Sequence, residues 1–179
     1  MNIILYIGGS GGDMISAVID STGYTFEGDR FKPPLNKDML KKPNLTDAEY
    51  DQHMKLMALQ YKSIPSHAIE YHIRKQHDCI LVDITEPSMI DWCVDRRYRL
   101  YGEPQWLTPD RRSPEFQKDF LIKKMNSALN HFPKTIKLRD ILEGRMIPKL
   151  QQYVDTELNE KMYFDWLISI VENNPPIST

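Results

Sequence analysis

The first twenty residues constrain the fold of this chain more than any other stretch. A short apolar run over residues 2–7 leads into the glycine cluster Gly8-Gly-Ser-Gly-Gly12, and an apolar stretch at helical spacing follows. A strand that opens into glycines and then a helix places backbone N–H groups at the N-terminus of that helix, where the helix dipole favours an anion. The pattern predicts a phosphate-binding loop between the first strand and the first helix.

Length and composition limit the class of protein. The chain has 179 residues, enough for one α/β domain but not for two ordinary ones, so we expect a single domain over residues 1–179. A net charge of −2 gives no indication of nucleic acid or of an anionic membrane as a partner. Cys79 and Cys93 are not spaced as a disulfide framework or a zinc site, which favours a reduced, cytoplasmic setting. No apolar run approaches the roughly 20 residues that span a bilayer.

Hydrophobic periodicity predicts alternating strands and helices. Residues 2–7 are apolar on both faces, so this strand belongs in the middle of a parallel sheet, with further strands at 79–84 and 134–138. The predicted helices cover residues 13–21, 46–61, 68–76, 88–101, 115–131, 148–153 and 157–171. We therefore expect a three-layer α/β fold, with a mainly parallel sheet flanked by helices and a ligand site at the carboxyl ends of the strands.

Local signals mark the ends of several elements. Thr46 and Glu49 form a capping box at the start of the second long helix, and Pro148 suits the first position of a later one. The proline-rich residues 24–44 predict an irregular excursion over the surface, and Pro65 predicts a helix break. Residues 172–179 predict a mobile tail.

The glycine loop differs from a Walker A loop, which needs a lysine for the outer phosphates and a hydroxyl for Mg²⁺. Asp13 stands where a hydroxyl would help, and its carboxylate repels a phosphate unless a metal or a basic side chain intervenes. A tight turn, with glycines for positive φ and close packing, is the alternative interpretation. The predicted ligand-binding residues of the loop are Gly9, Ser10, Gly11, Gly12 and Asp13.

His67 is the candidate general base. It follows Ser66 just after the break at Pro65, where a loop can present the imidazole to a cleft, and a histidine suits proton abstraction from an alcohol near neutral pH. A surface or helix-capping histidine is the alternative. The remaining histidines share no metal-ligand spacing, and we expect no metal site from His53, His72, His77 and His131.

Arginines form the third candidate group. Arg96 and Arg97 lie near the end of a predicted helix and Arg111 lies in the loop after it. Guanidinium groups suit phosphate and sulfate oxygens. The alternative is a solvated face on which Asp91 and Asp95 of the same helix pair with the arginines. The aspartates show no spacing specific for Mg²⁺.

The order of these features resembles the sulfotransferase branch of the P-loop fold. In that family a strand leads to a P-K-S-G-T-T loop that holds the 5′-phosphosulfate, and residues 7–13 keep its Ser-Gly pair. The family's catalytic histidine lies in a Thr-His pair, which Ser66-His67 resembles. The R-N-P turn of its 3′-phosphate site is similar in shape to residues 80–87, and its acidic C-terminal turn is similar to residues 139–142.

The chain departs from that family at named positions. Gly9 stands where the family has a lysine or arginine, and Gly12 and Asp13 replace hydroxyl residues. Thr85 stands where the 3′-phosphate arginine would be.

The resemblance implies a sulfotransferase-like transferase whose cofactor is 3′-phosphoadenylyl sulfate or another nucleotide. Residues 9–13 would hold the donor phosphate, His67 would be the base, and Arg96, Arg97 or Arg111 would supply charge. A kinase-like phosphotransferase is a close variant. The alternative from another class is a non-enzymatic interaction or assembly protein with a degenerate loop. The expected partner is a small phosphate-bearing ligand, with a protein partner under the non-enzymatic alternative.

Overall fold

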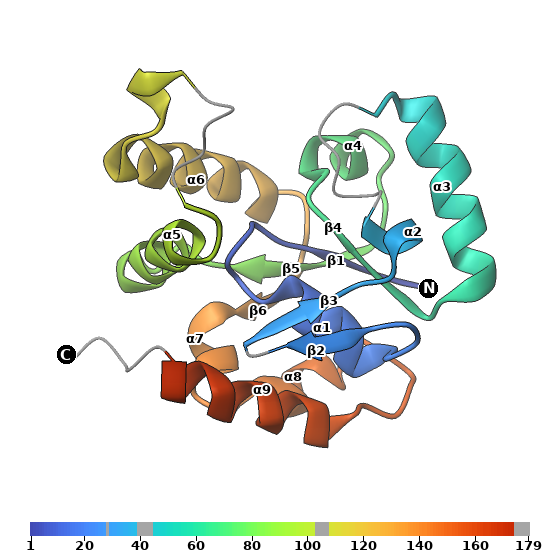
Figure 1. The fold of residues 1–179 in the computed structure, drawn as a ribbon. Helices are drawn as coiled ribbons and strands as arrows, with labels where there is room; N and C mark the ends of the chain where they lie inside the picture. The colour runs from blue at the N-terminus through green and yellow to red at the C-terminus, as the bar shows by residue number, and fades with distance from the viewer. Residues whose placement is uncertain (28, 39–44, 103–107, 174–179) are drawn as a thin grey trace.

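The sheet is built around the N-terminal strand β1 (Asn2–Leu5), as its apolar pattern predicted. The structure is a computed structural model that describes residues 1–27, 29–38, 45–102 and 108–173 (Figure 1). Within these residues the other strands of the sheet are β4 (Ser63–Ser66), β5 (Cys79–Asp83) and β6 (Lys134–Lys137). The order is β4-β1-β5-β6 and every pairing is parallel.

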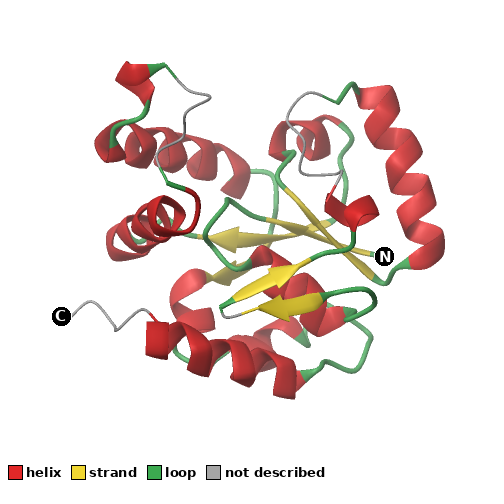
Figure 2. Cartoon of the chain, in the orientation of Figure 1, coloured by secondary structure: helices red, strands yellow, loops and turns green. Residues whose placement is uncertain are grey.

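Helices cover both faces of the sheet, which gives the expected three-layer α/β architecture (Figure 2). One side carries α1 (Gly12–Ile19), α7 (Leu138–Leu142), α8 (Met146–Leu150) and α9 (Glu160–Asn173). The other side carries α3 (Asp47–Gln60), α4 (Ile69–Arg74), α5 (Pro87–Tyr101) and α6 (Pro114–Leu129). No helix in the described ranges is both long and apolar enough to cross a membrane.

The core lies on both faces of the central strands. The residues Ile4, Leu5 and Leu81 are fully buried. Each such apolar side chain contributes about 1.5–3 kcal/mol relative to an exposed one. On one face α1 is buried between the sheet and α9, so every residue of α1 except Asp13 is buried. The strand and helix that flank the glycine loop are therefore fixed by the core.

The path of the chain makes the carboxyl end of β1 a crossover point. After β1 the chain runs through α1 and α3 to β4 on one side of β1, and it then crosses to β5 on the other side. In open α/β sheets, ligands bind in the crevice that opens where neighbouring connections leave in opposite directions. The glycine loop lies at this position.

Two short regular segments replace the irregular excursion expected over residues 24–44. The structure contains an antiparallel hairpin of β2 (Thr25–Glu27) and β3 (Arg30–Lys32), followed by α2 (Leu35–Asp38). The expectation was wrong here because three-residue strands are too short for a periodic pattern, and a ring stack of Phe26 on Phe31 at 4.7 Å supports the hairpin instead. Residues 28 and 39–44 lie outside the described residues.

Other boundaries follow local chemistry. The capping box is confirmed, because Thr46 Oγ1 accepts a hydrogen bond from the Glu49 N–H and Glu49 Oε2 accepts one from the Thr46 N–H at 2.7 Å. Pro65 lies within β4, opposite Ile4, where a break alone was expected. An edge strand tolerates proline because one side of its backbone needs no ladder hydrogen bond.

Two predictions near the C-terminus have different outcomes. Helix α8 begins at Met146, so Pro148 is its third residue and not its first, which is tolerated because the first four N–H groups of a helix have no intrahelical partner. Of the predicted tail, residues 172–173 are the end of α9 and residues 174–179 lie outside the described residues.

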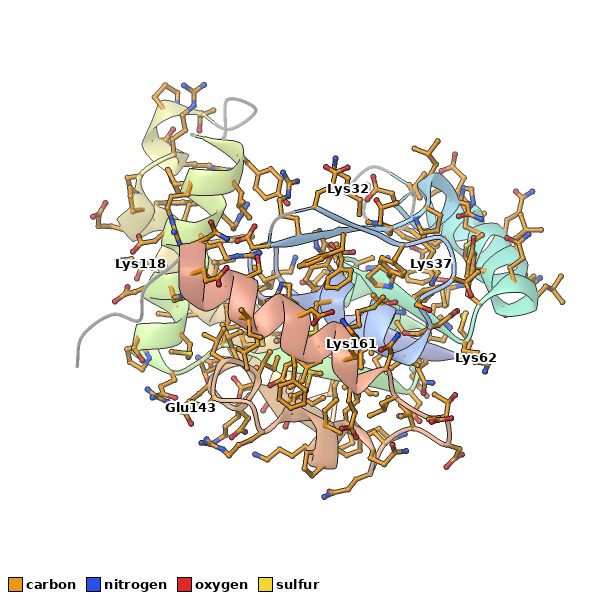
Figure 3. The ribbon with its side chains drawn as sticks, turned by 60° about the horizontal axis from the view of Figure 1, so that its bottom comes forward. Lys32, Lys37, Lys62, Lys118, Glu143 and Lys161 are labelled. Carbon is orange, nitrogen blue, oxygen red and sulfur yellow. The ribbon has the colours of Figure 1, made fainter. Side chains whose placement is uncertain are left out.

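Lys37 fixes α2 against the body of the protein (Figure 3). Its side chain is fully buried, and Nζ lies 3.7 Å from Asp20 Oδ2. The same atom lies 4.6 Å from the ring centroid of Tyr24 and 4.2 Å from that of Tyr61. Burial lowers the pKa of Lys37 to about 8, against the opposing effect of Asp20. This ion pair and the two aromatic rings hold the segment after the hairpin in place.

His72 is a buried histidine on α4. Its Nε2 lies 2.9 Å from Ser66 Oγ and its Nδ1 lies 2.9 Å from Nδ1 of His77, so both ring nitrogens are in hydrogen bonds. Burial, with a smaller effect from His77, lowers the pKa of His72 from 6.5 to about 3. The imidazole is therefore neutral in the folded protein at neutral pH.

This burial predicts loss of stability in acid. In the unfolded chain His72 takes up a proton near its ordinary pKa of 6.5, whereas the folded protein resists protonation until about pH 3. The free energy of unfolding contributed by neutral His72 is therefore full above pH 6.5 and is lost as the pH falls toward 3. The variant His72→Gln keeps a donor for Ser66 but has no imidazole to protonate. For each pH unit that the pH falls in this window, we expect its free energy of unfolding to decrease by about 1.4 kcal/mol less than that of the wild type. Urea unfolding of both proteins across the window measures the difference, and equal pH slopes would contradict it.

Candidate functional site

A cavity of about 420 Å³ opens at the carboxyl end of β1. Its walls come from the glycine loop, the β2–β3 hairpin, the start of α2, the end of α5 and Trp166 of α9. This volume falls within the roughly 300–1,000 Å³ of small-molecule sites. The cavity therefore coincides with the crossover point of the sheet.

Ser10 closes the turn of the glycine loop. Its backbone N–H and its Oγ both donate to the Ile7 carbonyl, at 3.0 and 2.7 Å. Ser10 is fully buried and does not line the cavity, so its hydroxyl belongs to the turn. Gly11 precedes α1 with φ of 81°, a left-handed conformation that suits glycine.

The backbone of the loop has several N–H groups without a protein acceptor in the described ranges. The N–H groups of Gly8, Gly9, Gly11 and Gly12 have no hydrogen-bond acceptor among the described residues. All four residues line the cavity, and the last three precede or begin α1. Donors without intrahelical partners at a helix N-terminus are suited to an anion.

Close packing also requires glycine at two of these positions. A Cβ on Gly12 would lie 2.0 Å from Cγ of Tyr6, and a Cβ on Gly9 would lie 2.7 Å from the Cys93 carbonyl oxygen of α5. Real contacts of this kind are never so short. The tight-turn interpretation therefore accounts for Gly9 and Gly12, while the backbone donors remain at the cavity.

Asp13 is engaged by Tyr6. The buried Tyr6 hydroxyl donates to Asp13 Oδ2 at 2.8 Å. Burial and the adjacent Asp13 carboxylate raise the pKa of Tyr6 well above its ordinary value, so the hydroxyl keeps its proton. A carboxylate in the first turn of α1 suits the helix dipole but places negative charge beside the loop donors. An anion in the cavity must therefore approach past this charge.

The sheet register places His67 beside the loop. Leu5 pairs with Ser66, so Tyr6 and His67 follow side by side beyond the ends of β1 and β4. Their ring centroids lie 4.3 Å apart in an edge contact, and His67 lines the cavity. Ser66, in contrast, is buried and its hydroxyl accepts from the Ala68 N–H at 3.2 Å. The predicted base and the predicted loop thus belong to one site.

Arg96 connects the loop to the hairpin. Its Nη1 donates to the Gly9 carbonyl at 3.1 Å and its Nη2 donates to the Asp29 carbonyl at 2.9 Å. The Asp29 carboxylate lies 3.4 Å from Nη2. Burial lowers the pKa of Arg96, and the Asp29 carboxylate opposes that effect. Arg96 lines the cavity, but both of its terminal nitrogens are bound to protein oxygens.

Arg97 and Arg111 lie outside the cavity lining. The Arg97 side chain packs over the loop, with Nε 3.6 Å from the Cβ position of Gly8, and Nη1 donates to Gln117 Oε1 at 3.5 Å. Arg111 is exposed on a short 3-10 helix, η2 (Pro109–Arg111), where its carbonyl accepts from Gln117 Nε2 at 2.7 Å. Asp91, the predicted partner of the arginines, pairs with Lys118 at 2.8 Å instead.

Sequence reasoning missed several residues of the cavity wall. Trp166 is 1% exposed, yet it lines the cavity and donates from Nε1 to the Asp29 carbonyl at 3.0 Å. Arg30 and Tyr101 also line the cavity, with the Arg30 guanidinium 4.9 Å from the Tyr101 ring centroid. No local motif marks these residues, because the hairpin that brings them together was not predicted.

The close approach of Tyr6 to Gly12 predicts a position-specific loss of stability. Gly12→Ala would force the Tyr6 ring out of its place, and overpacking of this kind costs about 1–3 kcal/mol or more. Gly8→Ala is the matched control, because its Cβ would meet only an ordinary contact at 3.6 Å. We expect the control to change the free energy of unfolding by less than about 0.5 kcal/mol. Urea unfolding measures both; equal effects would contradict the packing described above.

Comparisons with known proteins found no matching family model, no matching curated protein and no matching solved structure. Within the described residues, no group of three or more His, Cys, Asp or Glu side chains is placed to hold a metal ion. The chemistry of the cavity wall is therefore the basis for any assignment of function.

Proposed function

We propose that the protein binds a phosphate-bearing ligand of nucleotide size in the cavity beside the glycine loop. The observation that carries this proposal is that four glycines line the cavity and that their backbone N–H groups have no acceptor in the described part of the chain; they are Gly8, Gly9, Gly11 and Gly12. Several convergent backbone donors bind phosphate oxygens without a lysine. The position at the crossover point of a parallel sheet supports the same assignment.

The residues present fit the donor of a sulfotransferase only in part. The loop backbone can hold a phosphate, but Gly9 supplies no charged side chain. Thr85 faces a different site, where its Oγ1 donates to Asp83 Oδ1 at 2.7 Å. The ligand is therefore proposed by its class, an anionic nucleotide, of which 3′-phosphoadenylyl sulfate is one example.

His67 is the proposed base of a group transfer from such a donor. It lines the cavity next to Gly8, where an acceptor hydroxyl could meet both the imidazole and the donor. The imidazole takes the hydroxyl proton as the acceptor oxygen bonds to the transferred sulfur or phosphorus. The bond from that atom to the donor's bridging oxygen breaks, and the oxygen leaves with the electron pair. General base catalysis of this kind contributes about 10²–10⁴-fold in rate.

One observation favours the non-enzymatic alternative. The Tyr6 hydroxyl and the Asp13 carboxylate lie at the N-terminus of α1, the position at which a transferase of this type would stabilise charge. A protein that binds the ligand for recognition alone tolerates this arrangement better than one that must stabilise a transition state. Binding and turnover therefore need separate measurements.

Ligand binding should raise the melting temperature. We expect at least one of adenosine 3′,5′-bisphosphate, ATP and GTP, tested at millimolar concentration with and without Mg²⁺, to stabilise the full chain. Saturation at 100 times Kd adds about 2.7 kcal/mol. For a chain of this size, each added kcal/mol raises the melting temperature by roughly 2–4 °C. No shift with any of these ligands would reject the binding proposal.

Replacement of His67 should separate catalysis from binding. If a ligand turns over, we expect His67→Ala to lower the rate at least about 100-fold while the Kd of the donor changes by less than about threefold. His131→Ala is the control, since His131 is exposed and does not line the cavity. Loss of donor binding in His67→Ala would remove His67 from the role of base. Binding without turnover in the wild type would favour the non-enzymatic alternative.

A further inference from the structure

Arg30 is a basic side chain of the cavity whose donors are not used by the protein. It begins β3 at the hairpin turn and lines the cavity. Its guanidinium Cζ lies 4.9 Å from the ring centroid of Tyr101, at the end of α5. Among the described residues, no carboxylate or carbonyl accepts a hydrogen bond from this guanidinium. The contact with Tyr101 positions the group without occupying its N–H donors.

The other cations near the cavity either bind protein oxygens or lie outside the cavity lining. Arg96 binds the Gly9 and Asp29 carbonyl oxygens. Lys32, which Figure 3 labels, lines the cavity but forms an ion pair with Glu27, and both side chains are more than half exposed. Arg97 does not line the cavity. Arg30 is therefore the cation of the wall that is most available to a ligand.

The carboxylates of the cavity wall favour a cation beside a bound anion. Three carboxylates line the wall, those of Asp13, Asp29 and Asp38. The Asp29 carboxylate lies 3.4 Å from Arg96 Nη2, and Asp13 Oδ2 accepts a hydrogen bond from the Tyr6 hydroxyl. An anion at the loop donors lies next to the Asp13 carboxylate, and a second cation offsets this repulsion.

We infer that Arg30 is the anion-binding side chain of this site, supplied by the hairpin in place of the lysine that a Walker A loop carries. This inference rests on the proposed function. The glycine loop and Arg30 belong to different walls of one cavity, so a ligand that contacts both has an extended anionic tail. The ligand class is therefore a nucleotide with a diphosphate, triphosphate or phosphosulfate tail, bound in preference to the nucleoside monophosphate. Tyr101 is a positioning residue that holds the guanidinium at the wall.

The test measures the Kd of ATP and of AMP for the full chain by isothermal titration calorimetry. We expect Arg30→Gln to weaken ATP binding about 10- to 100-fold, the range for loss of a charged hydrogen bond, and to weaken AMP binding much less. Arg30→Lys should restore part of the ATP affinity, because it returns the charge without the planar fork. Tyr101→Leu should weaken ATP binding less than Arg30→Gln does. Lys62→Gln is the matched control, an exposed lysine away from the cavity lining, and should stay within about twofold of wild type.

The outcomes distinguish this inference from the function on which it rests. If the wild type binds ATP and Arg30→Gln binds it equally well, the role of Arg30 is wrong and the glycine-loop site stands. If ATP and AMP weaken together by the same factor, the extended-tail assignment is wrong. If the wild type binds neither nucleotide in the melting or the calorimetric measurement, the proposed function fails and the role of Arg30 fails with it. Thermal unfolding of each variant in the absence of ligand shows whether a loss of binding reflects a loss of fold.

Discussion

The buried guanidinium of Arg96 joins parts of the site that lie far apart in the sequence. It donates from α5 to the carbonyl of Gly9 in the loop and to the carbonyl of Asp29 in the hairpin turn. Trp166 of α9 donates to the same Asp29 carbonyl. Because a buried charge is costly unless it is hydrogen-bonded, these contacts hold the hairpin turn against the loop. The cavity has defined walls for that reason, although the hairpin itself is short.

The glycine loop serves packing and donor presentation together. Gly9 and Gly12 admit α5 and the Tyr6 ring at distances that no side chain would allow. Both glycines line the cavity, and their N–H groups have no acceptor in the described residues. The loop carries no lysine, and Arg30 of the hairpin lines the same cavity from another wall. The Asp13 carboxylate, which accepts a hydrogen bond from Tyr6, places negative charge beside these donors.

The sequence predicted the parts of the fold that local patterns determine. The two-faced apolar run predicted a central β1, and the Thr46 capping box predicted the start of α3, because burial and capping are encoded within a few residues. The hairpin and β4 were missed, since their strands have three and four residues and β4 contains Pro65. In the site, only the resemblance to sulfotransferases implied that His67 and the loop act together, and both line the cavity. The different contacts of Arg96, Arg97 and Arg111 were not predicted, because they depend on which oxygens the tertiary fold brings to each guanidinium.

The loop amides provide the most direct measurement. Titration of the ¹⁵N-labelled full chain with ATP, followed by amide chemical shifts, reports on the N–H groups of Gly8, Gly9, Gly11 and Gly12 individually. We expect saturable shifts at these four glycines, while Gly144, whose N–H already donates to the Ile141 carbonyl at 3.4 Å, stays unchanged. Saturable shifts confined to residues outside the loop and the cavity wall, or none up to millimolar ATP, would contradict an anion site at the glycine loop.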